Sequence, residues 1–115
     1  MTRHHKVAKN LKKHNHICDL VEEELQRRGW TTTQDIVYNN IKSGQLDVAG
    51  FKNKYAMVVE VKYNDCNRNH LHACEQTERA VNYCPELQSK RVFRMYGYHQ
   101  DKGYVLKFLT KKLYY

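Results

Sequence analysis

The sequence predicts an α/β fold, with a central mixed sheet flanked by helices. Two observations carry this prediction. Apolar residues recur at helical spacing in two segments, and five other segments are rich in β-branched and aromatic residues or alternate apolar with polar ones. The predicted order is α-β-β-β-α-β-β. A chain of 115 residues has room for one domain, residues 1–115, which includes a basic N-terminal arm over residues 1–14.

Four apolar residues at helical spacing predict the first helix, over residues 15–28. Gly29 is expected to end this helix, and Trp30 to pack beneath it. Three β-rich segments follow, predicted as strands at 31–38, 45–49 and 55–63. The last two are close enough in sequence to pair as a hairpin.

A second helix is predicted over residues 69–83, limited by Pro85, because the residue before a proline avoids the helical region. Two alternating segments, 91–98 and 104–109, predict the last strands. One stripe of the helix is expected to pack on the sheet through small residues: Ala73, Cys74, Thr77, Ala80, Val81 and Cys84.

The charge balance favours a polyanionic partner, because 20 Lys and Arg outnumber 12 Asp and Glu. An acidic membrane surface is the competing partner. No apolar run is long enough to span a membrane, and the basic start lacks the apolar stretch of a signal peptide. We therefore expect an intracellular protein of the cytoplasm or nucleoid, with reduced cysteines. Its origin, cellular or from a virus or mobile element, stays open.

Residues 1–14 carry several lysines and no acidic residue. This segment is either a solvated tail, or an arm or basic first helical turn that contacts phosphates. In the second case the DNA contacts are Lys6, Lys9, Lys12 and Lys13.

Asp47, Glu60 and Lys62 are charged residues inside segments that otherwise predict buried strands. Burying charge costs several kcal/mol unless it is compensated, and a bound divalent metal would compensate it. Strand alternation places Glu60 and Lys62 on one face, with Val61 on the other. The same alternation places Leu46 and Val48 toward the core, so that Asp47 and Glu60 converge if the two strands pair.

Two carboxylates and the backbone carbonyl of Val61 make an oxygen-rich site that suits Mg²⁺ or Mn²⁺. Such a metal binds a phosphate oxygen and lowers the pKa of a water, while Lys62 orients that water or neutralises charge. This pattern predicts phosphodiester hydrolysis. The alternative is structural: Asp47 is a solvent residue near a turn, and Glu60 and Lys62 are a surface pair.

The residues that carry this pattern are Gly29 and the segments Gly44-Gln45-Leu46-Asp47-Val48 and Val59-Glu60-Val61-Lys62. Over residues 15–109 the chain resembles the PD-(D/E)XK nuclease superfamily, and most of all the archaeal-type Holliday junction resolvases and their small single-domain relatives. The resemblance implies a restriction-endonuclease-like core, Asp47 and Glu60 as metal ligands and Lys62 as the catalytic lysine. Leu46 stands where the family motif has a proline.

A second departure concerns the first helix, where these nucleases usually carry a glutamate. That place falls on Cys18, so Glu22 or Asp19 would have to supply the acid, and we favour Glu22. Ordinary surface charge is the alternative for both. On the second helix, Gln76 and Tyr83 resemble the glutamine and tyrosine that face the active site in RecB-type relatives, and a solvated helix face is the alternative.

Arg68 and Arg79 are candidates for bidentate phosphate contacts, or for salt bridges to Glu75 or Glu78. A zinc site is an alternative, although its candidate ligands fit no standard zinc spacing: Cys66, His70, His72 and Cys74.

The leading function is a metal-dependent endonuclease selective for branched or junction DNA. We expect a homodimer, because so small a chain cannot enclose branched DNA alone. The alternatives are a restriction-like, homing or repair nuclease of the same fold, and a non-catalytic basic nucleic-acid-binding module.

Overall fold

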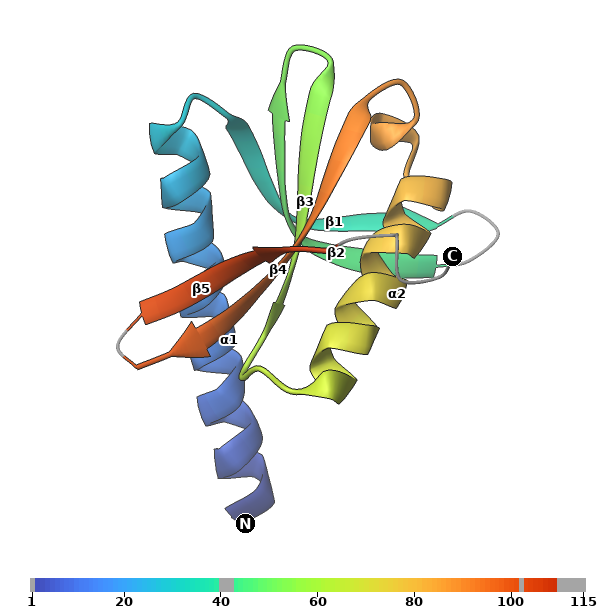
Figure 1. The fold of residues 1–115 in the computed structure, drawn as a ribbon. Coiled ribbons are helices and arrows are strands. Elements are labelled where there is room, and N and C mark those ends of the chain that lie inside the picture. The colour runs from blue at the N-terminus through green and yellow to red at the C-terminus, as the bar shows by residue number, and fades with distance from the viewer. Residues whose placement is uncertain (1, 40–42, 102, 110–115) are drawn as a thin grey trace.

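In a computed structural model of the chain, the described residues form a five-stranded mixed sheet with an α-helix on each face (Figure 1). The structure describes residues 2–39, 43–101 and 103–109, and the side chains of residues 12–37, 45–101 and 103–109. The predicted α/β class, mixed sheet and flanking helices are confirmed.

The elements follow one another along the chain as α1 (Thr2–Arg27), β1 (Thr31–Asn39), β2 (Ser43–Lys52), β3 (Tyr55–Lys62), α2 (Asn67–Tyr83), the 3₁₀ helix η1 (Pro85–Leu87), β4 (Arg91–Gln100) and β5 (Gly103–Phe108). The sheet order is β1-β2-β3-β4-β5. Only β3 and β4 are parallel among the described pairs, because α2 crosses over between them. The 3₁₀ turn and the longer β2 were not predicted.

Helix α1 begins at Thr2, so the helix start near Asn15 and the separate arm are wrong, and the alternative that the basic segment is helical is confirmed. The segment before Asn15 holds no glycine or proline and is rich in lysine, which propagates a helix well. The predicted end is confirmed. Gly29 has a φ of 89°, and the Trp30 N–H donates to the Leu25 carbonyl at 3.0 Å, as in a Schellman motif.

The hairpin of β1 and β2 bends about halfway along its length (Figure 1). Asp35 has a φ of 55°, and the register skips from Gln34↔Val48 to Ile36↔Leu46 at this point. Val48 packs in the cluster beneath α1, whereas Leu46 packs in the cluster beneath α2. The prediction that Leu46 and Val48 share one core face is therefore wrong, because the bend interrupts strand alternation at Asp47.

The sheet buries apolar side chains on both faces. On β3, Val59 and Val61 pack under α1, and Ala56 and Val58 pack under α2. The small-residue stripe of α2 is buried as predicted, except that Val81 is half-buried. Both helices thus lie against β3, and their N-terminal halves flank the end of β3 at Lys62 (Figure 1).

Helix α2 is tied to the sheet by Arg94 on β4. Its guanidinium donates to the Thr77 hydroxyl at 2.9 Å and to the Cys74 carbonyl at 2.5 Å. Cys18, Cys66, Cys74 and Cys84, all among the described residues, are free thiols. Neither α1 nor α2, over their described residues, has the length and apolar composition of a membrane span.

Candidate active site

The site lies where β2 separates from β3. Regular pairing between the two strands ends at Val48↔Val59. Beyond it, the backbone N–H of Val61 donates to Asp47 Oδ2 at 2.8 Å. The Asp47 carboxylate therefore stands in for the missing backbone acceptor, and the bend in β2 holds it beside the end of β3.

Glu60 is 6% exposed on the face of β3 that carries α2. Its Oε2 lies 3.6 Å from Lys62 Nζ, which confirms that Glu60 and Lys62 share a face. Its Oε1 is buried and has no hydrogen-bond partner among the described residues. An unpartnered buried carboxylate oxygen is costly, so this atom needs an explanation.

The two carboxyl groups have pKa values displaced in opposite directions. Burial, and then the negative charge of Asp47, raise the pKa of Glu60 to about 8. Burial acts to raise the pKa of Asp47 as well, but hydrogen bonds from His14 and the Val61 N–H outweigh it and hold that pKa below its ordinary value. Neighbouring carboxyl groups whose pKa values are displaced in opposite directions are typical of functional sites.

Two members of the site, both on α1, were given no role by the sequence: His14, and Cys18, which was noted only as the residue at the expected glutamate position. His14 Nε2 lies 3.2 Å from Asp47 Oδ2, and Cys18 Sγ lies 3.8 Å from His14 Nδ1. The hydrogen bond to Asp47, followed by the one to Cys18, raises the pKa of His14 to about 11. Burial raises the pKa of the Cys18 thiol.

A signal for these residues was present in the sequence. His14, Cys18, Val21 and Leu25 follow one another at intervals of four, three and four residues, which places them on one face of a helix. Cys18, Val21 and Leu25 are buried between α1 and the sheet. His14 is the polar member of that face, so it points toward the sheet.

The structure does not bring Glu22 to the site. Its carboxylate accepts hydrogen bonds from the Thr32 hydroxyl at 2.8 Å and the Gln34 amide at 3.0 Å. Asp19 also accepts from Gln34, at 2.9 Å. Glu22 lies eight residues from His14, about 12 Å along the helix. This placement corrects the choice of Glu22 as the first-helix acid, because α1 turns Glu22 toward β1 and turns His14 and Cys18 toward Asp47.

The other predicted residues lie around the site without joining it. Gln76 is half-buried on α2, and among the described side chains no hydrogen bond links it to Asp47, Glu60 or Lys62. Arg68 is exposed and Arg79 is half-buried on the same helix, neither with an ion pair among the described residues. Lys12 is exposed on α1. The side chains of Lys6 and Lys9 lie outside the described residues.

Lys13 contacts an aromatic side chain beside the site. Its Nζ donates to the Tyr63 hydroxyl at 3.3 Å and lies 5.3 Å from the centre of that ring. Tyr63 in turn stacks on His99, with ring centroids 6.2 Å apart. Lys13 adjoins His14 and Tyr63 adjoins Lys62 in the sequence, so this row begins beside the His14 end of the site, on the face of the sheet opposite Lys62. Tyr63 and His99 were not predicted as site residues.

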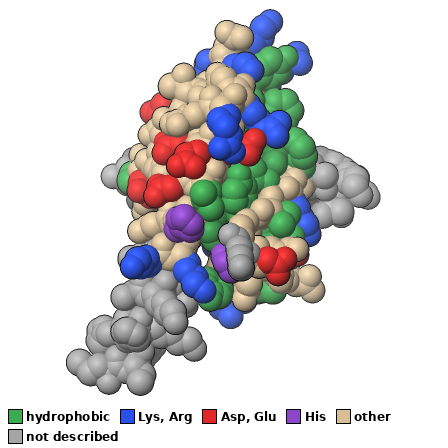
Figure 2. Space-filling view, turned by 90° about the vertical axis from the view of Figure 1, so that its left-hand side faces the viewer, with side chains coloured by type: hydrophobic (Ala, Val, Ile, Leu, Met, Phe, Trp, Pro, Cys, Tyr) green, Lys and Arg blue, Asp and Glu red, His purple; other side chains and the backbone are tan. Residues whose placement is uncertain are grey.

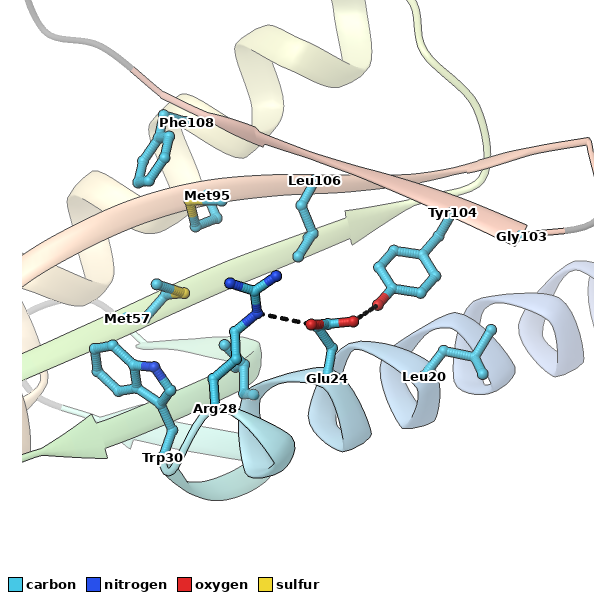
Figure 3. Close-up of a pocket in the computed structure, with 11 residues that line it drawn as sticks. Leu20, Glu24, Arg28, Trp30, Met57, Met95, Gly103, Tyr104, Leu106 and Phe108 are labelled. Atoms are coloured by element: carbon cyan, nitrogen blue, oxygen red, sulfur yellow. Dashed lines mark hydrogen bonds and ion pairs between the residues drawn. The ribbon is translucent and has the colours of Figure 1, made fainter.

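A separate pocket of about 640 Å³ lies between α1 and strands β3 to β5 (Figure 3). Glu24, which accepts hydrogen bonds from Arg28 at 2.7 Å and Tyr104 at 3.5 Å, forms its polar edge. Figure 2 shows a band of exposed hydrophobic side chains on this side of the molecule. Asp47, Glu60 and Lys62 do not line the pocket, whose apolar lining is Leu20, Leu25, Trp30, Met57, Met95, Leu106 and Phe108.

Comparison with known proteins identifies no family. No protein-family profile and no curated protein matches the chain. Among solved structures, a protein of unknown function, AF1548, matches 51% of this chain at 14% identity and a TM-score of 0.44. The matched part spans 35% of that protein's length. A likeness this low assigns neither fold nor function.

Proposed function

We propose that the chain is a divalent-metal-dependent DNA endonuclease of the PD-(D/E)XK type, with a restriction-endonuclease-like core, that hydrolyses phosphodiester bonds. The observation that supports this most is the unpartnered, buried Oε1 of Glu60 beside the Asp47 carboxylate. In a purely structural role Glu60 would stay protonated and hydrogen-bond to Asp47, as its raised pKa allows, whereas a bound cation would hold both carboxylates ionised and satisfy that oxygen.

The residues present fit a hard divalent cation. Asp47 and Glu60 supply carboxylate oxygens, which Mg²⁺ and Mn²⁺ prefer. The Val61 carbonyl is a third candidate. In a strand the N–H and C=O of one residue point to the same side, and the Val61 N–H already points at Asp47. When bound there, the metal would polarise a phosphate oxygen and lower the pKa of a water.

Lys62 would act on the charge that develops during hydrolysis. Its side chain is 20% exposed and its ammonium lies 3.6 Å from Glu60 Oε2, so it is held at the mouth of the site. From there it would orient the attacking water and neutralise charge on the phosphate. Asp47 is kept ionised by His14 and the Val61 N–H, and so is ready to hold a cation.

The proposed substrate is DNA, branched or junction DNA in particular, inside the cell. The net charge of +8 favours a polyanion. The row of Lys13, Tyr63 and His99 begins beside the His14 end of the site and offers a cation for phosphate and an aromatic ring that is 39% exposed at Tyr63. Stacking on such a ring tolerates any base, so it suits recognition by shape.

The proposed active form is a homodimer, because a junction resolvase needs two nuclease sites and the described residues of one chain form one. The exposed apolar surface beside α1 includes Phe93 and Phe108 from the late strands β4 and β5, 41% and 62% exposed. We propose that a second copy covers this surface. Size-exclusion chromatography should give a dimer on junction DNA, and a strict monomer on and off DNA would contradict this part of the proposal.

The test of the activity is cleavage of a four-way junction with Mg²⁺ or Mn²⁺ by Asp47→Asn and Glu60→Gln variants. Each should lose cleavage while it still binds the junction, because each loses a metal ligand and gains no bulk. Asp65→Asn is the matched control, since Asp65 pairs with Lys107 at 3.2 Å outside the site. Full cleavage by both site variants would end the proposal.

A further inference from the structure

We propose that His14, Cys18 and Asp47 form a second metal site, selective for Zn²⁺ over Mg²⁺, that shares Asp47 with the proposed magnesium site. One donor atom from each residue lies within 4.8 Å of the other two. No comparison and no part of the family resemblance assigns a metal to His14 or Cys18.

The fold builds this cluster from two elements. His14 and Cys18 are four residues apart on α1, which places both on the face that packs on the sheet. Asp47 reaches them from the bend in β2, with Oδ2 3.2 Å from His14 Nε2. Neighbouring ligand atoms of a tetrahedral zinc site lie roughly 3.3–3.8 Å apart, as its bond lengths of about 2.0–2.3 Å require. His14 now contacts Asp47 through Nε2 and Cys18 through Nδ1, so its ring must turn to present one nitrogen to an ion held between them.

The donor set selects the metal. Thiolate and imidazole are poor ligands for Mg²⁺ and good ones for Zn²⁺, and three protein ligands leave a fourth position for water. Cys18 is 3% exposed and the His14 side chain 28%, so the open position faces out on the His14 side. This asymmetry lets an ion enter past His14 and meet the buried thiol last.

Binding exchanges protons for the ion. The Cys18 thiol loses its proton to form the Zn–S bond, and the imidazolium of His14 loses one to free a nitrogen lone pair. Asp47 is already ionised and gives up its hydrogen bond from His14. Zinc binding therefore releases two protons to solvent, and no oxidant or reductant takes part.

One consequence rests on the proposed nuclease function. An Asp47 carboxylate drawn toward His14 and Cys18 is withdrawn from Glu60, so Zn²⁺ should inhibit cleavage supported by Mg²⁺. The cysteine found where related nucleases carry a glutamate would thus make this enzyme sensitive to zinc.

The binding test uses Co²⁺ as a spectroscopic probe for zinc, on the full reduced chain. The wild type should bind one equivalent and show a near-ultraviolet thiolate-to-cobalt charge-transfer band, which Zn²⁺ abolishes and excess Mg²⁺ leaves in place. Cys18→Ser should lack the band, and His14→Ala should bind at least about tenfold more weakly, a loss typical even of outer-shell partners. Cys66→Ser, which removes an exposed thiol, is the matched control and should keep it.

A wild type without the band, or a band that persists in Cys18→Ser, would overturn the proposal. His14→Ala keeps the test decisive if Cys18→Ser does not fold, because His14 is not part of the buried apolar core. In the activity arm, Zn²⁺ should inhibit the wild type more strongly than Cys18→Ser, each compared with its own rate in Mg²⁺. Absence of cleavage by the wild type would defeat the proposed function and leave the cobalt result standing.

Discussion

The imidazole of His14 lies 3.2 Å from the carboxylate of Asp47, and so joins the first helix to the bend in strand β2. This contact holds Asp47 at the end of β3 together with the Val61 N–H. It also brings a histidine and a cysteine of α1 to the Asp47 carboxylate. The chemistry of the site therefore depends on α1 as much as on the two strands.

From this contact we predict how the pKa of Asp47 changes when His14 is removed. Burial acts to raise the pKa of this carboxyl, and the hydrogen bond from His14 is the largest of the opposing effects. In His14→Ala the pKa of Asp47 should therefore rise, as measured by NMR titration of the carboxyl carbon in metal-free protein. His16→Ala alters an exposed histidine on the same helix and should leave the titration unchanged. Equal titrations in both variants would show that His14 does not stabilise the Asp47 charge.

Glu60 makes the metal-free protein less stable as the pH rises. Its pKa is raised to about 8 in the folded state from an ordinary value near 4.5. An acid with a raised folded pKa has no effect below its unfolded pKa, and its penalty grows until the pH passes its folded pKa. Glu60→Gln should thus unfold like the wild type at pH 4.5 and be more stable by about 2–4 kcal/mol at pH 8.

Urea unfolding of both proteins in EDTA at the two pH values checks this prediction. Asp65→Asn, which alters an exposed carboxylate, should show no comparable gain at pH 8. A Glu60→Gln variant that is less stable than the wild type at pH 8 would contradict the account of an unsatisfied carboxylate.

Arg94 should contribute strongly to stability, because it joins β4 to α2 through Thr77 and the Cys74 carbonyl. Arg94→Met removes both hydrogen bonds and leaves a buried carbonyl without this donor, at a cost of about 1–3 kcal/mol. Arg91→Met alters an exposed arginine at the start of the same strand and should cost much less. Thermal unfolding of the two variants compares them, and equal losses would show that Arg94 does not secure α2.

Lys13 should contact a DNA phosphate, because it lies over Tyr63 beside the site. Lys13→Ala should weaken junction binding and reduce the slope of log K against log salt by about 0.9, the value for one phosphate contact on duplex DNA. Lys54→Ala is the matched control, since Lys54 lies in the β2–β3 turn, about 25 Å from Lys62 along β3. An unchanged slope in Lys13→Ala would show that this lysine stays away from the phosphates.

The sequence predicted the features that local rules control. Gly29 ends α1 because a helix end needs a residue that adopts a positive φ easily. The small residues of α2 are buried because they let the helix approach the sheet. Glu60 and Lys62 share a face because residues two positions apart on a strand point to the same side.

The features that tertiary contacts control were not predictable in this way. The residues around Asp35 do not predict its φ of 55°. The bend that places Leu46 and Val48 on opposite faces of the sheet was therefore not predicted. Asn15 has the chemistry of a helix cap, but the residues before it continue the helix and bring His14 into the site. Glu22 was preferred to Asp19, and His14 was not considered because it was placed in a segment before the helix.

The most direct test of the proposed function is cleavage of a four-way junction and a matched linear duplex with Mn²⁺, by the wild type and by Lys62→Ala. Lys62 is held 3.6 Å from Glu60 and is not proposed to ligate the metal, so its loss should remove the chemistry and leave junction binding intact. We expect the wild type to cleave the junction in preference to the duplex, and Lys62→Ala to cleave neither. Equal cleavage by the two proteins, or none by the wild type, would contradict the assignment of Asp47, Glu60 and Lys62 as a nuclease site.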